Sequence, residues 1–184
     1  MIPIYLDPAH VRVALIGRAE RAARRLSWLK AAGMQPELFS DEPAAELQEA
    51  AGAALQQRLP TTRELAGFHA IWIADLPLSL ARGLASTARA VHTPVNVEDV
   101  PALCDFHTPA VVRRGELTLA AGTGGASPAV ARAARERLEQ AFEPGWGEAL
   151  GDIARARLAL REAGVDAEAL SADARQRLAL HGLG

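Results

Sequence analysis

The stretch VRVALIGRAERAARRL, which begins at Val11, limits more than any other what this chain can fold into. Its apolar run ends at Gly17 without polar alternation, which is typical of a strand buried on both faces. The residues after the glycine place Ala22, Leu26 and Leu29 on one helical face, with Arg21, Arg24 and Arg25 mostly off it. A doubly buried strand followed at once by an amphipathic helix predicts an α/β fold with a parallel sheet.

The same alternation continues through the first hundred residues. Further strands are predicted at 35–39, weakly at 56–59, at 69–74 and at 94–97, and helices at 44–55 and 78–91. Strands separated by helices of this length require right-handed crossover connections. We therefore expect a Rossmann-like parallel sheet.

The pattern changes after Pro101. Two β-rich runs at 110–114 and 116–121 meet at Gly115, which predicts a hairpin or a pair of edge strands. A helix is expected at 128–142, followed by two amphipathic helices at 147–164 and 167–181. The chain thus divides into a Rossmann-like domain of the NAD-binding type at 1–108, a small α+β region at 109–144 and a helical region at 145–184.

The charge balance argues against some classes of partner. The net charge of −2 over 184 residues gives no overall attraction to nucleic acid or to an anionic membrane. No segment has the roughly 18 uninterrupted apolar residues of a membrane span, and the first residues lack the features of a signal peptide. The single cysteine, Cys104, excludes an internal disulfide. We expect a cytoplasmic protein that binds neither nucleic acid nor membrane.

The turn after the first strand is an unusual version of a dinucleotide-binding loop. It reads Gly17-Arg18-Ala19-Glu20-Arg21-Ala22, where G-x-G-x-x-G or G-x-G-x-x-A is typical. Gly17 can make the tight turn, but Ala19 places a methyl group where the backbone approaches a pyrophosphate. The loop is either an altered nucleotide site or a turn that binds no nucleotide.

An acidic residue follows the second predicted strand. Asp41 lies about 20 residues beyond the loop, where a carboxylate can bind the ribose hydroxyls of NAD. Such a contact favours NAD over NADP, although Arg18 and Arg21 are able to bind the 2′-phosphate of NADP. The alternative is that Ser40 or Asp41 caps the helix at 44–55.

A second candidate site is Asn96-Val-Glu-Asp99, beyond the end of the strand at 94–97. Ligands of open α/β sheets bind outside the carboxyl ends of the strands, and a carboxylate there can act as a general base. The alternative is a solvated acid in a turn before Pro101.

A third candidate is the glycine-rich segment Gly122–Pro128. Ser127 as N-cap and Pro128 at the first helical position predict a helix start, and the glycines before it leave N–H groups available to an anion. A flexible connection is the alternative. His107 is a weak candidate for a metal ligand and is otherwise structural, and Cys104 is expected to be a small buried apolar group.

Several of these segments resemble the precorrin-2 dehydrogenase/sirohydrochlorin ferrochelatase family, which includes the N-terminal part of siroheme synthase. The similarity begins at PIYLD, from Pro3, and is clearest in PVNVEDVPALCDF, from Pro94. It continues through PAVVRRGELTL, from Pro109, and TGGASPAVAR, from Thr123. It covers most of residues 3 to about 160.

The resemblance implies oxidation of precorrin-2 to sirohydrochlorin with NAD⁺, in siroheme or cobalamin biosynthesis. It also implies, in some members, insertion of Fe²⁺ or Co²⁺, for which a metal would be the substrate. A homodimer is expected, with the 109–144 region as its dimerisation region. Two further interpretations stay open: a chelatase that has lost NAD binding, and a non-catalytic homologue that binds a tetrapyrrole or stabilises a partner enzyme.

The resemblance also assigns roles to residues. Asp99 matches the family's essential aspartate, which handles protons in both reactions and is also a weak metal candidate. Positions expected to contact NAD are Gly17, Arg18, Ala19, Glu20, Arg21, Asp41, Glu42, Ala74 and Asp75. Positions expected to contact the polycarboxylate tetrapyrrole are Asn96, Arg113, Arg114, Thr123, Gly124, Gly125 and Ser127.

The chain departs from the family pattern in two places. The family usually has three consecutive glycines in the first loop, and here the residues are Gly17, Arg18 and Ala19. A Thr-Asp-Asp-like segment usually follows the fourth strand, and here the residues are Ala74-Asp75-Leu-Pro. Both departures fall on the cofactor half of the predicted site.

Overall fold

Strand β1 (Val13–Gly17) is the middle strand of a five-stranded parallel sheet in a computed structural model that describes residues 1–183. The strand order is β3-β2-β1-β4-β5, so successive crossovers run to one side of β1 and then to the other. The remaining strands of this sheet are β2 (Glu37–Phe39), β3 (Leu55–Gln56), β4 (Ala70–Ala74) and β5 (Val95–Val97). The predicted Rossmann-like α/β fold is confirmed.

Helices cover both faces of this sheet because its central strands, β1 and β4, have no polar residue and are buried at every position. Odd and even positions of β1 point to opposite faces, so Val13 and Leu15 pack in one core and Ala14 and Ile16 in another. The first core includes helices α1 (Glu20–Lys30) and α2 (Ala45–Ala51), and the second includes α3 (Thr62–Leu65) and α4 (Leu78–Ala90). The sheet is therefore buried on both faces, as the sequence predicted.

Most predicted elements are present with small shifts at their ends, and the main differences lie between residues 44 and 65. The helix expected at 44–55 ends at Ala51 and continues as a 3-10 turn, η1 (Gly52–Ala54), and the third strand is Leu55–Gln56 instead of 56–59. Neither Ser40 nor Asp41 caps α2, because its N-cap is Ala44, which has no side-chain hydrogen bond to offer.

Helix α3 was missed because it has only four residues, too few for an apolar period to show. Its signal in the sequence was the capping box that begins at Thr61. The Thr61 hydroxyl accepts from the N–H of Glu64, and the Glu64 carboxylate accepts from the N–H of Thr61.

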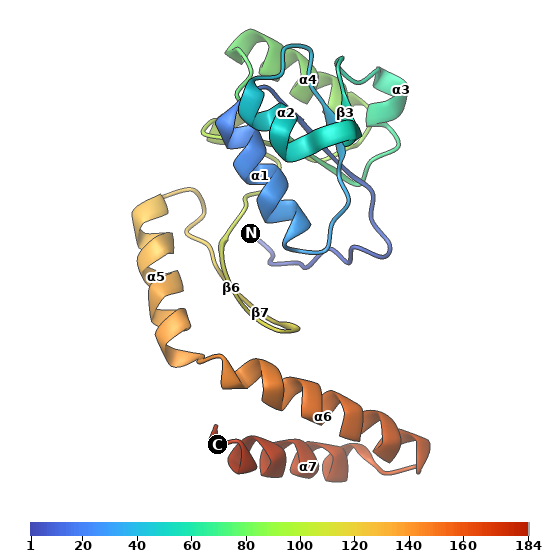
Figure 1. The fold of residues 1–184 in the computed structure, drawn as a ribbon, viewed down its shortest axis with the longest axis vertical. Coiled ribbons are helices and arrows are strands. Elements are labelled where there is room, and N and C mark those ends of the chain that lie inside the picture. The colour runs from blue at the N-terminus through green and yellow to red at the C-terminus, as the bar shows by residue number, and fades with distance from the viewer. Residues whose placement is uncertain (184) are drawn as a thin grey trace. The chain divides into compact units, whose positions relative to one another are not determined.

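A second unit begins at Thr108, after a first unit that ends at His107. It contains the antiparallel hairpin β6 (Ala110–Arg114) and β7 (Leu117–Ala121), then α5 (Pro128–Ala141), α6 (Gly145–Glu162) and α7 (Ala167–Leu180) (Figure 1). The predicted hairpin is confirmed, and Gly115 at its turn has a φ of +56°, which suits glycine. The expected regions 109–144 and 145–184 both lie in this unit.

The second unit has little core of its own. Its buried apolar side chains, among the residues that the structure describes, are Val112, Ala149 and Leu170. Helix α5 contains no buried residue at all. A two-stranded hairpin is only marginally stable without a surface to pack on. The unit therefore leaves much of its apolar surface uncovered.

Candidate functional site

Three strand ends meet at one edge of the parallel sheet. Gly17 of β1 pairs in register with Ala74 of β4, and Ile73 pairs with Val97 of β5. The crossovers reverse direction between β1 and β4, which is where open α/β sheets bind their ligands. Gly17 is required here because a Cβ at this position would lie 2.5 Å from the Cβ of Ala22. Close packing of α1 on β1 thus depends on this glycine.

Asp75, directly after β4, points its carboxylate at the first turn of α1. Its Oδ2 accepts a hydrogen bond from the backbone N–H of Ala22 at 3.1 Å. The residue has a φ of +57°, in the left-handed region that residues other than glycine rarely adopt. The carboxylate therefore satisfies one of the free N–H groups at a helix N-terminus, where negative charge is stabilised.

Asp99 lies in the tight turn that follows β5. This turn is closed by the N–H of Val100, which donates to the carbonyl of Val97 at 3.1 Å, and Asp99 has a φ of +61°. Its side chain is 71% exposed. Strained backbone of this kind is common at functional sites. The turn thus presents the Asp99 carboxylate outward at the sheet edge.

Cys104 stabilises the same turn through hydrogen bonds of its sulfur, so it is more than the small buried apolar group expected from the sequence. Its sulfur accepts from the N–H of Val97 at 3.3 Å and donates to the carbonyl of Val97 at 3.2 Å. Burial raises the pKa of the Cys104 thiol, so the residue stays in the neutral form that can donate.

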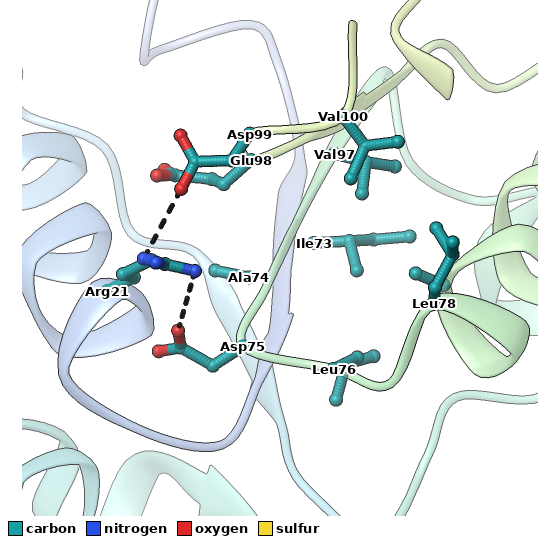
Figure 2. A pocket seen from close by; sticks show the side chains of 11 residues that line it. Arg21, Ile73, Ala74, Asp75, Leu76, Leu78, Val97, Glu98, Asp99 and Val100 are labelled. Carbon is teal, nitrogen blue, oxygen red and sulfur yellow. Dashed lines mark ion pairs between the residues drawn. The ribbon is translucent and has the colours of Figure 1, made fainter. Parts of the chain in front are cut away.

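Arg21 lies between the two acids (Figure 2). Its Nε is 3.3 Å from Oδ2 of Asp99, and its Nη1 is 3.8 Å from Oδ1 of Asp75. The three side chains border a pocket of about 140 Å³ whose apolar wall includes Ile73 and Val97. A pocket of this size admits part of a ligand, since sites for drug-sized molecules are several times larger. The arrangement places a carboxylate, a guanidinium and an apolar wall at one strand edge.

Arg25 and Glu98 form a further ion pair that the sequence did not reveal. Their side chains are 15% and 18% exposed, and the Arg25 guanidinium also lies over the ring of Trp28, 4.9 Å from its centroid. The helical pattern predicted Arg25 to lie mostly off the packed face. The pair joins α1 to the turn that contains Asp99, so it positions that turn.

On the other side of β1, Arg18 binds the acidic residues at the end of β2. Its Nε and Nη2 donate to Oδ1 and Oδ2 of Asp41 at 2.9 and 2.6 Å, and its Nη1 lies 2.8 Å from Oε2 of Glu42. The hydrogen bond from Arg18 lowers the pKa of Asp41, and the same bond raises the pKa of Arg18. Both groups are therefore charged at neutral pH.

The remaining predicted cofactor residues have local roles. Glu20 is paired with Arg24 at 3.3 Å on the exposed side of α1. Ala19 is the N-cap of α1 and makes no side-chain hydrogen bond. Ala74 is buried at the end of β4. Their contacts with a cofactor stay predictions.

The glycine-rich segment of the second unit forms a compact turn. Gly124 and Gly125 have φ values of +68° and +82°, which explains why glycine is needed there. The Thr123 hydroxyl accepts from the N–H of Ser127 at 3.2 Å. Ser127 caps α5, as predicted, by accepting from the N–H of Val130. Anion binding by this turn stays a prediction.

Three predicted substrate residues already have partners within the fold or are partly enclosed. Arg114 donates to the carbonyls of Phe142, Glu139 and Arg113, so it caps the C-terminus of α5. The buried amide of Asn96 donates to the carbonyl of Phe106 at 2.8 Å. Arg113 is half-buried in β6. A tetrapyrrole that bound Arg114 or Asn96 would have to replace these bonds.

His107 is exposed at the end of the first unit. Residues 1–183 contain no group of three or more His, Cys, Asp or Glu side chains arranged to hold a metal ion. The weak metal assignments to His107 and Asp99 thus gain no support from neighbouring ligands. None of the helices in the described chain combines the length and apolar character of a membrane span.

Comparison with known families adds to this geometry. Residues 4–110, more than half of the chain, match the model of a family described as putative NAD(P)-binding. The chain belongs to this family. Its match covers the parallel sheet and both acidic turns.

Relatives of the whole chain are siroheme synthases. The chain is 32% identical over 165 residues to that of Thiobacillus denitrificans and 33% identical over 178 residues to that of Chromobacterium violaceum. These alignments cover 88% and 95% of the chain but only 34% and 37% of the relatives, so the chain spans about a third of their length. A solved structure described as SirC, precorrin-2 dehydrogenase, has the same fold, with a TM-score of 0.69 over 96% of this chain and 88% of the other at 20% identity. The family resemblance stated from the sequence is confirmed.

The cofactor implied by this family fits the residue types of the site. Asp41 and Glu42 are acceptors at the end of β2, and the first turn of α1 lies beside Gly17. Next to them the hydroxyl of Ser40 is fully buried without any hydrogen-bond partner, which marks a place where a polar group would be accommodated. An NAD molecule bound here would have its adenosine ribose at Asp41 and its pyrophosphate at the start of α1.

Proposed function

We propose that this chain oxidises precorrin-2 to sirohydrochlorin with NAD⁺. The observation that carries the proposal is the pocket at the carboxyl ends of β4 and β5, where Asp99, Arg21 and Asp75 meet beside the first turn of α1. Members of dinucleotide-binding folds bind ligands at this edge. The relatives and the matching family model support the same activity.

The residues of the site have distinct roles in this reaction. Oxidation of precorrin-2 removes a hydride and a proton, and bound NAD⁺ supplies the acceptor for the hydride. The exposed carboxylate of Asp99 accepts the proton, since a carboxylate at the pocket mouth can act as a general base. Arg21 orients that carboxylate through its Nε contact at 3.3 Å. Ile73 and Val97 provide the apolar wall against which one pyrrole edge rests.

Titration of the purified protein with NAD⁺, followed by an assay with precorrin-2, tests the proposal. We expect saturable binding and an absorbance change as sirohydrochlorin forms. Absence of NAD⁺ binding at millimolar concentration would remove the dehydrogenase function.

A second candidate function is metal insertion without oxidation. It is favoured by one observation: Arg18 occupies both acids of the cofactor half, whereas Asp99 is left accessible. Insertion of Fe²⁺ or Co²⁺ requires two pyrrole nitrogens to lose their protons, for which Asp99 is again the available base. Mixing the protein with sirohydrochlorin and Co²⁺ separates this function from that of a non-catalytic homologue, because only the chelatase changes the absorbance.

The proposal includes a cytoplasmic homodimer. Support for dimerisation comes from the second unit, where Val130, Leu158 and Leu180 are 58%, 63% and 79% exposed and few apolar residues are buried. A surface of this kind is typical of a region that packs against another chain. Sedimentation equilibrium should give twice the chain mass of 19.5 kDa, and a mass of one chain would contradict it.

A further inference from the structure

Arg18 occupies the acceptors that the ribose of the cofactor needs. Its guanidinium uses Nε and Nη2 on the two oxygens of Asp41 and Nη1 on Glu42. A guanidinium has five N–H groups in a fixed plane, and this geometry matches a carboxylate with two parallel bonds. The side chains of Arg18 and Asp41 are only 19% and 29% exposed, so water weakens their pairing less than that of a fully exposed pair.

A backbone hydrogen bond also joins the two loops between which the Arg18 side chain lies. The carbonyl of Arg18 accepts a hydrogen bond from the N–H of Ala44 at 2.6 Å, which joins the β1–α1 loop to the β2–α2 connection. The Arg18 side chain then crosses from this loop to the end of β2. A ribose must lie in that interval if its hydroxyls are to reach Asp41 while the pyrophosphate reaches the first turn of α1.

We infer that Arg18 lowers the affinity of this chain for its dinucleotide, because it pairs with Asp41 and Glu42 and so keeps the adenosine ribose from these two carboxylates. This inference rests on the proposed function. The cofactor binds only when the guanidinium leaves the two carboxylates, so the ion pairs that are lost weaken its binding. The nicotinamide half would lie on the other side of β1, at Asp75 after β4, where Arg18 makes no contact.

The same contacts argue against a role for Arg18 in binding a 2′-phosphate. Three of its nitrogens are paired, and the two carboxylates around them add one more negative charge than the guanidinium neutralises. A phosphate in this position would face net repulsion. Arg18 therefore weakens binding of the adenosine half of both NAD⁺ and NADP⁺.

The experiment compares Arg18→Gln with Arg89→Gln by calorimetric titration. Arg89 is a suitable control because its Nε donates to Asp105 at 2.8 Å, and Asp105 accepts from the N–H of Val95 at the amino end of β5, the opposite end of that strand from the site. We expect Arg18→Gln to bind NAD⁺ and ADP-ribose at least about tenfold more tightly than the wild type, since charge-assisted pairs need no longer be broken. Arg89→Gln should bind both as the wild type does. Nicotinamide mononucleotide, which lacks adenosine, should bind all three proteins equally.

Each other outcome has a defined meaning. Equal NAD⁺ affinities in the wild type and Arg18→Gln would overturn the inference and leave the proposed function standing. Weaker binding by Arg18→Gln, or NADP⁺ binding by the wild type that this variant loses, would make Arg18 a cofactor ligand and also overturn the inference. If neither protein bound NAD⁺, both the proposed function and the inference would fail.

Discussion

The carboxylate of Asp75 accepts a hydrogen bond at 3.1 Å from the N–H of Ala22, although 53 residues separate the two in the sequence. An acceptor from another strand thus caps α1, whose own N-cap residue, Ala19, offers no side-chain bond. Because Asp75 supplies the acceptor that Ala19 lacks, α1 can start directly after an altered glycine loop. It also requires Asp75 to adopt a left-handed φ of +57°.

Replacement of Asp75 should separate the capping effect from the backbone strain. We expect Asp75→Ala to lower the free energy of unfolding by about 1–3 kcal/mol, because it loses the acceptor and keeps an unfavourable φ. Asp75→Gly loses the same acceptor but adopts this φ freely, so its loss should be smaller by about 1 kcal/mol. Urea unfolding followed by circular dichroism measures both. Equal losses would mean that the φ of this residue carries no strain.

Gly17→Ala should destabilise the first unit. The added Cβ would lie 2.5 Å from the Cβ of Ala22 and 2.7 Å from the carbonyl oxygen of Ala74, so α1 must move away from the sheet. We expect a loss of about 1–3 kcal/mol in urea unfolding. The matched control is Gly83→Ala in α4, where nothing lies within 4 Å of the new Cβ. Alanine there should raise the free energy of unfolding by about 0.5–1 kcal/mol, because it favours the helix more than glycine does. A neutral Gly17→Ala would show that the first loop is not closely packed.

The parallel sheet could be predicted because each of its central strands is a short run of apolar residues. β1 and β4 are buried at every position, and this leaves a signal in the sequence that does not depend on distant contacts. The helix start at Ser127 was equally local, since its cap and the following Pro128 are neighbours. Elements stabilised by their own residues were therefore located well.

The site was predicted by position only, because its contacts join distant residues. The acidic turns at Asp41 and Asp99 were recognised from their places after strands, but their partners Arg18 and Arg21 are set by how α1 lies on the sheet. The sequence equally allowed Asp41 to cap α2. Arg25 was predicted to lie mostly off the packed face, yet its side chain is only 15% exposed, because an arginine can bury its long apolar stem while its charge pairs with a carboxylate such as that of Glu98.

Asp99→Asn tests the general base of the proposed reaction. Asparagine keeps the shape of the side chain and tolerates the φ of +61°, so the fold should be retained, with an unfolding free energy within about 0.5 kcal/mol of the wild type. The loss of a proton acceptor should lower kcat for precorrin-2 oxidation by about 10²–10⁴-fold, while NAD⁺ binding is unchanged. Glu49→Gln, at an exposed position of α2, is the control. Full activity in Asp99→Asn would remove this carboxylate from the mechanism.

The capping box of α3 should make stability depend on pH in a defined window. The hydrogen bond from Arg58, together with those from Thr61, lowers the pKa of Glu64 to about 2. In the unfolded chain the same carboxyl titrates near its ordinary value of about 4.3. Because the folded pKa is the lower one, the stabilisation is complete above about pH 5 and is lost as the pH falls from there toward 2. We expect the difference in urea midpoint between the wild type and Glu64→Gln to be constant from pH 7 to 5 and to shrink steadily below pH 4. The difference for Glu49→Gln should show no such decline, and a constant difference for Glu64→Gln down to pH 2 would show that its charge does not stabilise α3.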